Sequence, residues 1–433
     1  MNISLVQGST TLVLNGTGAA VPLRAGKIDL SAPGLAVIEC ALDGTAAQIA
    51  SFQQSAEKIL MLGGLYASLP GEDWAYVWVT LPDGSVWRSP VLGSKTAAAP
   101  GPGSRGGGSQ GFKLWLEIAL WWESTTLTDV ALSNHWGTLQ TGGLQVDNHQ
   151  DAGHDDYVNI AASTILGDVP APAVLTLSSS VNGLEYLVGQ CVTNGVAAFT
   201  GMLEGESISV GVGGITVTPT ADAACSSGNY AACGWNGAGV VGGGWGVDPT
   251  SYAARVYRPV LRLRNFVAGG EKILLWVRLT GPAGDILLDA EGVIMPTDRK
   301  LVVLPPVALP PWSKPPAGFS WEGLTPWMVV QAEGAGAHVL NVDFFQMLPT
   351  EGWLRFYCVQ PLMTYSQVRY DCGSGQNTRS ATAGVTHVPE GPGIWLYPGV
   401  QQKIFVLNQN AADSAIGTNT TVRVQYRARK RVL

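Results

Sequence analysis

Turn-forming residues recur along this whole chain and limit most strongly the folds it can adopt. Its 433 residues include 55 Gly and 26 Pro, which separate short apolar stretches from one another. Glycine and proline disfavour helix interiors and favour turns, whereas the 15 Trp and 12 Tyr favour strands. The pattern therefore predicts an all-β protein built from β-sandwich domains, with no helix of useful length after Gly64.

One helix is expected, beginning after Thr45. Thr45 and Gln48 have the spacing of a capping box, and Gly63 is expected to end the helix. The helical spacing of one apolar face predicts packing against a sheet; this face comprises Ile49, Phe52, Ala56, Ile59 and Leu60. That sheet should include a hairpin, with strands at 74–81 and 86–92 around the turn Pro82-Asp83-Gly84-Ser85.

The length favours two or three domains. Residues 1–95 are interpreted as an N-terminal β-sandwich with the one helix. Residues 96–111 have almost nothing to bury, so they are expected to be a Gly/Pro-rich linker or a long exposed loop, and the clearest domain boundary. Residues 112–433 are expected to form a second sandwich, interrupted by a Gly-rich insertion at 181–247.

The charge content favours permanent assembly and excludes some partners. Only 13% of the residues are charged, against roughly 25% in a typical soluble domain. A surface with so few charged residues is expected to pack against other copies of the chain. The net charge of -7 argues against nucleic acid as a partner. No signal-peptide pattern opens the sequence, and no apolar stretch approaches the roughly 20 residues that span a bilayer, so we expect cytoplasmic synthesis without membrane insertion.

The cysteine and glycine patterns indicate no cofactor. The six Cys contain no C-x-x-C, and no glycine cluster has a phosphate-binding fingerprint. Two pairs, Cys225 with Cys233 and Cys358 with Cys372, are close enough in sequence for disulfides, although a reducing cytoplasm favours thiols.

Residues 147–156 are the segment with the most chemically capable side chains, because two imidazoles and several carboxylates fall within ten positions. They follow neither the EF-hand calcium pattern nor H-E-x-x-H. We therefore expect a polar loop between strands and no bound metal, with four weak candidate ligands: Asp147, His149, Asp151 and His154.

Catalytic motifs are not found, so the chain is not expected to be an enzyme. It has no G-x-S-x-G, and no His has an evident Ser or Cys partner. Carboxylates such as Glu322, Glu333 and Asp343 are scattered rather than paired. Aromatic residues of the last domain are candidates for stacking on sugar rings, although core packing is the commoner use of Trp: Trp312, Trp321, Trp327, Trp353 and Trp395.

Five stretches, in order along the chain, resemble minor tail and distal-tail-like (Dit-like) proteins of long-tailed bacteriophages and prophages. Ile165 and Met347 stand where the family pattern has Asn and Leu. The stretches are Trp121-Trp122-Glu123-Ser124, Tyr157-Val158-Asn159-Ile160, Gly167-Asp168-Val169-Pro170-Ala171-Pro172, Val342-Asp343-Phe344-Phe345-Gln346-Met347-Leu348-Pro349, and Tyr397-Pro398-Gly399 with Val424-Gln425-Tyr426-Arg427.

The resemblance implies a galactose-binding-like or jelly-roll sandwich in the second part of the chain, and a first domain that forms a ring at the tail tip. It implies a structural protein of the virion that is made in the host cytoplasm and packs with its own copies and other phage tail proteins. The alternative is a receptor-binding tail module that uses the aromatic residues to bind a host cell-surface glycan.

Overall fold

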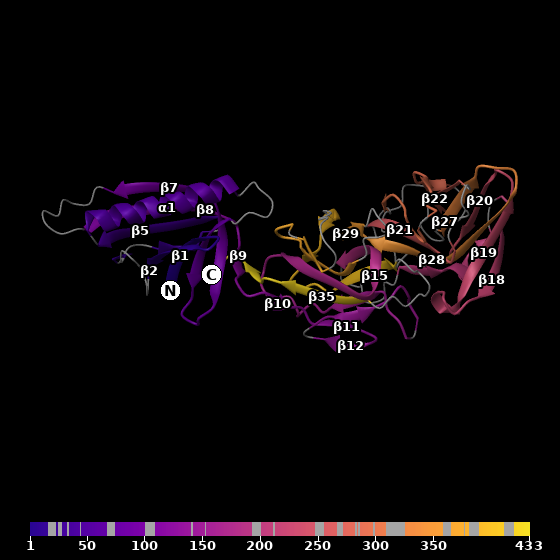
Figure 1. The fold of residues 1–433 in the computed structure, drawn as a ribbon, viewed down its shortest axis with the longest axis horizontal. Coiled ribbons are helices and arrows are strands. Elements are labelled where there is room, and N and C mark those ends of the chain that lie inside the picture. Colours follow the sequence, from indigo (N-terminus) through magenta and orange to yellow (C-terminus); the bar gives the residue numbers. More distant parts are fainter. Residues whose placement is uncertain are drawn as a thin grey trace.

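The fold was analysed in a computed structural model of the chain. The structure describes residues 1–15, 23–24, 28–32, 34–43, 45–66, 74–99, 109–139, 142–151, 153–192, 201–210, 213–246, 255–265, 272–281, 284, 286–297, 299–308, 325–357, 365–375, 377–380, 389–410 and 420–433. These residues form an all-β protein with one α-helix, which confirms the expected fold class. Three β-units follow one another along the long axis (Figure 1).

The first unit consists of a curved sheet, the helix α1 and the returning C-terminus. The sheet order is β2-β1-β6-β7-β8-β5-β3, with β4 beside β5, and β9 beside β7 and β36. Its strands are β1 (Asn2–Gln7), β2 (Thr10–Asn15), β3 (Leu23–Arg24), β4 (Ile28–Asp29), β5 (Leu35–Asp43), β6 (Ala75–Thr80), β7 (Val86–Ala99), β8 (Ser109–Ile118), β9 (Trp122–Ser124) and β36 (Arg429–Lys430).

The helix α1 (Ala46–Tyr66) starts as the sequence predicts. The Thr45 amide donates to Gln48 Oε1 at 2.9 Å, and the Gln48 amide donates to Thr45 Oγ1 at 3.3 Å, which confirms the capping box. All five residues of the expected apolar face are buried in the core of the first unit. The end expected at Gly63 is wrong, because glycine permits a helix to stop but does not force it to.

The hairpin of β6 and β7 forms with the expected turn, in which Asp83 accepts hydrogen bonds from the amide and hydroxyl of Ser85. The far half of β7 then pairs with β8, and β8 also pairs with β5. The first unit therefore extends beyond the boundary expected at 96–111. The physical reason is burial, because alternate residues of β8 (Leu114, Leu116 and Ile118) enter the core that α1 covers.

The middle unit surrounds one long strand, β15 (Ala171–Val192). Its near half pairs with β30 and β35, and its far half pairs with β29 and β34. The other strands of this unit are β10 (Thr128–Asp129), β11 (Leu132–Asn134), β12 (Gly137–Leu139), β13 (Leu144–Val146), β14 (Tyr157–Ile160), β29 (Gly352–Tyr357), β30 (Tyr365–Asp371), β31 (Asn377–Ser380), β32 (Glu390–Gly393), β33 (Trp395–Leu396), β34 (Gln402–Asn410) and β35 (Thr420–Tyr426).

The third unit is a sandwich inserted into the middle unit, between β15 and β29. One sheet contains β16 (Met202–Glu204), β18 (Thr216–Ala221), β19 (Asn229–Asn236), β21 (Val256–Leu263), β25 (Leu301–Val303), β26 (Val307–Ala308) and β28 (Ala337–Pro349). The other contains β17 (Ser209–Val210), β20 (Val240–Gly244), β22 (Ile273–Thr280), β23 (Ile286–Asp289), β24 (Val293–Ile294) and β27 (Thr325–Ala332).

The insertion therefore differs from the one expected at 181–247. Residues 181–192 complete β15, whereas the strands after residue 247 pair within the inserted sandwich; β28, for example, pairs with both β19 and β21. The expectation failed because glycine content marks turns within a domain as readily as a domain boundary. What defines the unit is a shared core between its two sheets, which includes Trp235, Leu261, Leu275 and Val330.

The far half of β15 is buried on both faces. Tyr186 and Val188 point into the core of the middle unit, whereas Leu187 and Cys191 join the core of the inserted sandwich. Between them, Gly189 allows β28 to approach closely. A Cβ at this position would lie 2.5 Å from Leu348 Cγ and 2.6 Å from the carbonyl oxygen of Pro349. The inserted sandwich is thus packed directly against the middle sheet.

Four cysteines whose side chains the structure describes are free thiols: Cys191, Cys225, Cys233 and Cys372. Cys225 and Cys233 are therefore not joined, and burial raises the pKa of Cys233 to about 12. Cys358 lies outside the described residues. Within the described part of the chain, α1 is not apolar enough along its length to cross a membrane, and no other helix is long enough.

Gly189→Ala should destabilise the protein by about 1–3 kcal/mol, because the added methyl group must displace the backbone of β28. Chemical denaturation followed by tryptophan fluorescence measures the change. The matched control is Gly239→Ala, at an exposed position where an added Cβ would have no neighbour within 4 Å. Equal stability of the two variants would contradict close packing of the inserted sandwich on β15.

Candidate functional site

Buried polar groups gather at two places where the β-units meet. The first, here called the first junction, lies in the first unit where the chain returns from β35 of the middle unit, and it contains Arg88, Glu123 and Arg429. The second, here called the loop cluster, lies between the middle unit and the inserted sandwich and contains Asp147, His149, Asp151 and His154.

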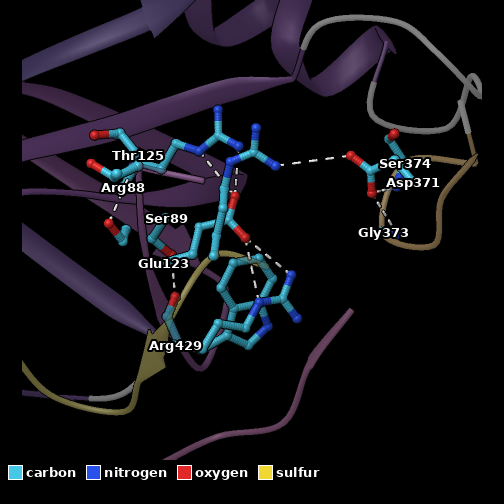
Figure 2. A network of polar contacts seen from close by, with 12 residues as sticks. Arg88, Ser89, Glu123, Thr125, Asp371, Gly373, Ser374 and Arg429 are labelled. Carbon is cyan, nitrogen blue, oxygen red and sulfur yellow. Dashed lines mark hydrogen bonds and ion pairs between the residues drawn. The ribbon is translucent and has the colours of Figure 1, made fainter. Parts of the chain in front are cut away.

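In the first junction, Glu123 is paired with two arginines (Figure 2). Its Oε1 is 2.7 Å from Arg88 Nη2, and its Oε2 is 3.1 Å from Arg429 Nη2. The guanidinium carbon of Arg429 also lies 3.5 Å from the ring centre of Trp121. Burial lowers the pKa of Arg429, and the Glu123 carboxylate opposes that shift. The arginine at the end of the chain is thus held by charge and by an aromatic face.

Backbone contacts of Arg429 tie the middle unit to the same point. Its carbonyl oxygen accepts from the amides of Asp168 at 2.9 Å and Val169 at 3.3 Å. The amide of Arg431 donates to Asp168 Oδ1 at 2.9 Å. Gly167 has a φ of +110°, and a Cβ there would lie 2.3 Å from the Arg429 carbonyl oxygen, so only glycine fits. Residues 121–124 and 167–172 therefore meet at this junction.

Glu123→Gln should destabilise the protein by about 3–5 kcal/mol, because it leaves the largely buried Arg88 and Arg429 without their counter-charge. The loss is measured by denaturation, and limited proteolysis should cut between the first and middle units sooner than in the unchanged protein. Asp129→Asn is the control, since it removes the more exposed Arg423–Asp129 pair within the middle unit and should cost less than about 1 kcal/mol. Similar losses for both variants would contradict a special role for the first junction.

The loop cluster lies on residues 147–156, between β13 and β14. Each flanking strand is fixed in the middle sheet, β13 by β35 and β14 by β34. The loop closes on itself through the amide of Asp147, which donates to the Asp155 carbonyl at 3.0 Å. At its tip, Asp151 Oδ1 accepts from the Gly153 amide at 2.8 Å, an Asx turn that brings His154 back toward Asp147.

Asp151 contacts both histidines of the cluster. Its Oδ1 is 2.7 Å from His154 Nδ1, and its Oδ2 is 3.0 Å from His149 Nε2. The two imidazole rings are stacked, with centroids 4.3 Å apart and planes 8° from parallel. His154 Nε2 faces Asp147 Oδ2 at 4.0 Å. The loop therefore holds two imidazoles between two carboxylates.

Asp147 is the buried member of the cluster, with 4% of its surface exposed. Its Oδ1 has no hydrogen-bond partner among the described residues. Burial raises the pKa of Asp147 to about 7, although the nearby His154 opposes the shift. A buried carboxylate oxygen without a partner is uncommon in proteins.

The inserted sandwich supplies the opposite wall of the loop cluster. The Ser227 amide donates to His149 Nε2 at 3.0 Å, and Ser227 has a φ of 51°, in the left-handed region. Ser226 Oγ donates to Glu204 Oε1 at 2.8 Å, and burial raises the pKa of Glu204 to about 7. Sequence reasoning missed Ser227 and Glu204 because they lie far along the chain, in a Gly-rich region without a motif.

Three of the four weak metal candidates are brought together. Asp147, His149 and His154 each offer one ligand atom, and these atoms lie within 4.8 Å of one another. Asp151 instead lies against both histidines and orients His154 through a hydrogen bond. Two imidazole nitrogens and a carboxylate oxygen are a donor set suited to a divalent transition metal.

The other predicted site residues are dispersed. Trp353 is 3% exposed and presents no face to a sugar, Trp327 lies on β27 of the inserted sandwich, and Trp395 lies on β33 of the middle unit. Trp312 and Trp321 lie outside the described residues. Of the scattered carboxylates, Asp343 is fully buried against Arg262, Glu333 is exposed beside Lys272, and Glu322 lies outside the described residues.

No family model matches this chain, and no curated protein matches it. Among solved structures, a Paenibacillus xanthan lyase is similar to it at 12% sequence identity and a TM-score of 0.26. The match covers 99% of this chain and 50% of the lyase chain, so this chain spans about half of that protein's length. A TM-score this low carries no conclusion about function.

Proposed function

We propose that this chain is a structural protein of a bacteriophage tail tip or baseplate, of the minor tail or distal-tail type. In this role it is a component of the virion that packs with its own copies and with other tail proteins. The observation that carries the proposal is the first junction, where the end of the chain returns to the first unit through the buried Glu123–Arg429 pair.

This junction suits an assembly subunit for a mechanical reason. A subunit that contacts neighbours at both ends needs a fixed angle between its domains, since a loose joint would add an ordering cost to each contact. Here the Glu123–Arg429 pair holds β36 in the first unit, and backbone hydrogen bonds from residues 168 and 169 to Arg429 tie the middle unit to it. The residues that build this tie also include part of the sequence resemblance to phage tail proteins, which supports the same role.

Exposed leucines at one end of the first sheet offer a surface for association between copies. Leu35, Leu92 and Leu120 are 37%, 55% and 67% exposed. Leu35 begins β5, Leu92 lies in β7 and Leu120 follows β8, and these three strands are neighbours in the sheet. Leu35 pairs with Glu117, and Val91 pairs with Ile118, so all three leucines lie at the same end. Covering such a surface would favour a homo-oligomer assembled through the first unit.

The double variant Leu92→Asp/Leu120→Asp should shift the purified protein from a closed oligomer to a monomer, because two charges cannot be buried in an apolar contact without a large penalty. Light scattering coupled to size exclusion measures the mass. The control is Ile294→Asp, which alters a 62% exposed apolar side chain on the inserted sandwich and should leave the oligomer intact. A monomeric unchanged protein, or an oligomer that survives the double substitution, would contradict assembly through this surface.

A further inference from the structure

We propose that the loop cluster is a binding site for one divalent transition-metal ion of the zinc class, held by Asp147, His149 and His154. This inference is independent of the proposed tail function. It rests on the contacts of the three side chains and on the unsatisfied oxygen of Asp147.

The first argument is the direction of the His154 ring. Its Nδ1 lies 2.7 Å from Asp151 Oδ1, so the proton of the neutral ring belongs on Nδ1 and the lone pair on Nε2. A carboxylate that orients a histidine in this way is the usual outer partner of a metal-binding imidazole. Nε2 then faces Asp147 Oδ2 across 4.0 Å. Metal bonds to nitrogen and oxygen of about 2.1 Å each fit this gap with a small inward movement.

The second argument is the state of Asp147. Only 4% of the residue is exposed, yet its Oδ1 accepts no hydrogen bond from the residues that the structure describes. Burying an acceptor without a partner is costly, and a cation beside it removes that cost. His154 Nε2, the nitrogen that faces the other Asp147 oxygen, lies 4.0 Å from Oδ2, beyond hydrogen-bond distance, so it satisfies neither oxygen. A metal ion between the two is the simplest common partner.

His149 supplies the third ligand and links the ion to the inserted sandwich. One of its ring nitrogens belongs to the set of atoms within 4.8 Å of one another. The ring is parallel to that of His154, so it must turn for both lone pairs to meet one ion. Turning it gives up the hydrogen bond from the Ser227 amide. Metal binding should therefore alter the contact between the loop and the inserted sandwich.

The donor types select the metal. Calcium and magnesium prefer sites made only of oxygen atoms, whereas two imidazoles with one carboxylate suit Zn²⁺ and neighbouring transition metals. His154 is 40% exposed at its side chain, which leaves the ion accessible from solvent and a coordination position open to water.

Direct metal analysis tests the site. Full-length protein, freed of any affinity tag and stripped with a chelator, is dialysed against micromolar ZnCl₂ and analysed for retained metal. We expect about one zinc per chain. Asp147→Asn and His154→Gln should abolish retention, whereas Asp151→Asn, which removes the orienting carboxylate, should weaken affinity about 10- to 100-fold. The control His338→Gln alters a histidine on β28 of the inserted sandwich and should retain zinc fully.

A second measurement separates ligand loss from misfolding. Co²⁺ added to the unchanged protein should give the intense visible absorption of a low-coordinate site with nitrogen ligands, and Zn²⁺ should displace it. The thermal midpoint of the unchanged protein should also rise with ZnCl₂, and that of His154→Gln should not. The proposal is overturned if the unchanged protein retains no zinc and gives only the spectrum of aqueous Co²⁺, or if Asp147→Asn and His154→Gln retain zinc as the unchanged protein does.

Discussion

The packing of β15 between two apolar cores is the constraint on which the rest of the structure depends. Its far half pairs with β29 and β34, so three strands form a layer with the core of the middle unit on one side and the inserted sandwich on the other. Because both faces are apolar, neither unit can be separated without exposing a sheet to water. The loop cluster is positioned by this layer, because β14 pairs with β34.

Polar contacts add to the apolar packing, and the first junction and the loop cluster use them differently. In the first junction, each carboxylate oxygen of Glu123 is paired with one arginine, so both oxygens have a partner and the geometry is defined. In the loop cluster, one oxygen of Asp147 has no hydrogen-bond partner in the part of the chain that the structure describes. A buried carboxylate that is paired with charges of its own chain holds the packed segments in place, whereas a buried carboxylate with an oxygen left over is suited to bind a cation. This contrast underlies the separate proposals for tail structure and metal binding.

Local features were predictable because their physics is local. The capping box at Thr45, the buried face of α1 and the Asp83 turn depend on residues within a few positions of one another, and all three form as expected. The domain limits were not predictable in this way, because strand pairing joins segments that are far apart in the sequence. Nothing near β8 in the sequence shows that it pairs with β5 as well as β7, and nothing near residue 247 shows that the inserted sandwich continues to β28. The sequence likewise placed four candidate ligands in one loop but not Ser227 opposite them.

Composition and turn residues alone determined that this protein is an all-β chain with one capped helix and a polar loop at 147–156, since propensity and hydrophobic period act over a few residues. The tertiary structure alone decided that the chain is nested, with a sandwich inside the middle unit and Arg429 returned to the first unit. It also decided which side chains of the loop converge, and which of the described ones is buried without a partner. The nesting and the return of Arg429 depend on contacts between residues hundreds of positions apart, whose energies arise only when the sheets have packed.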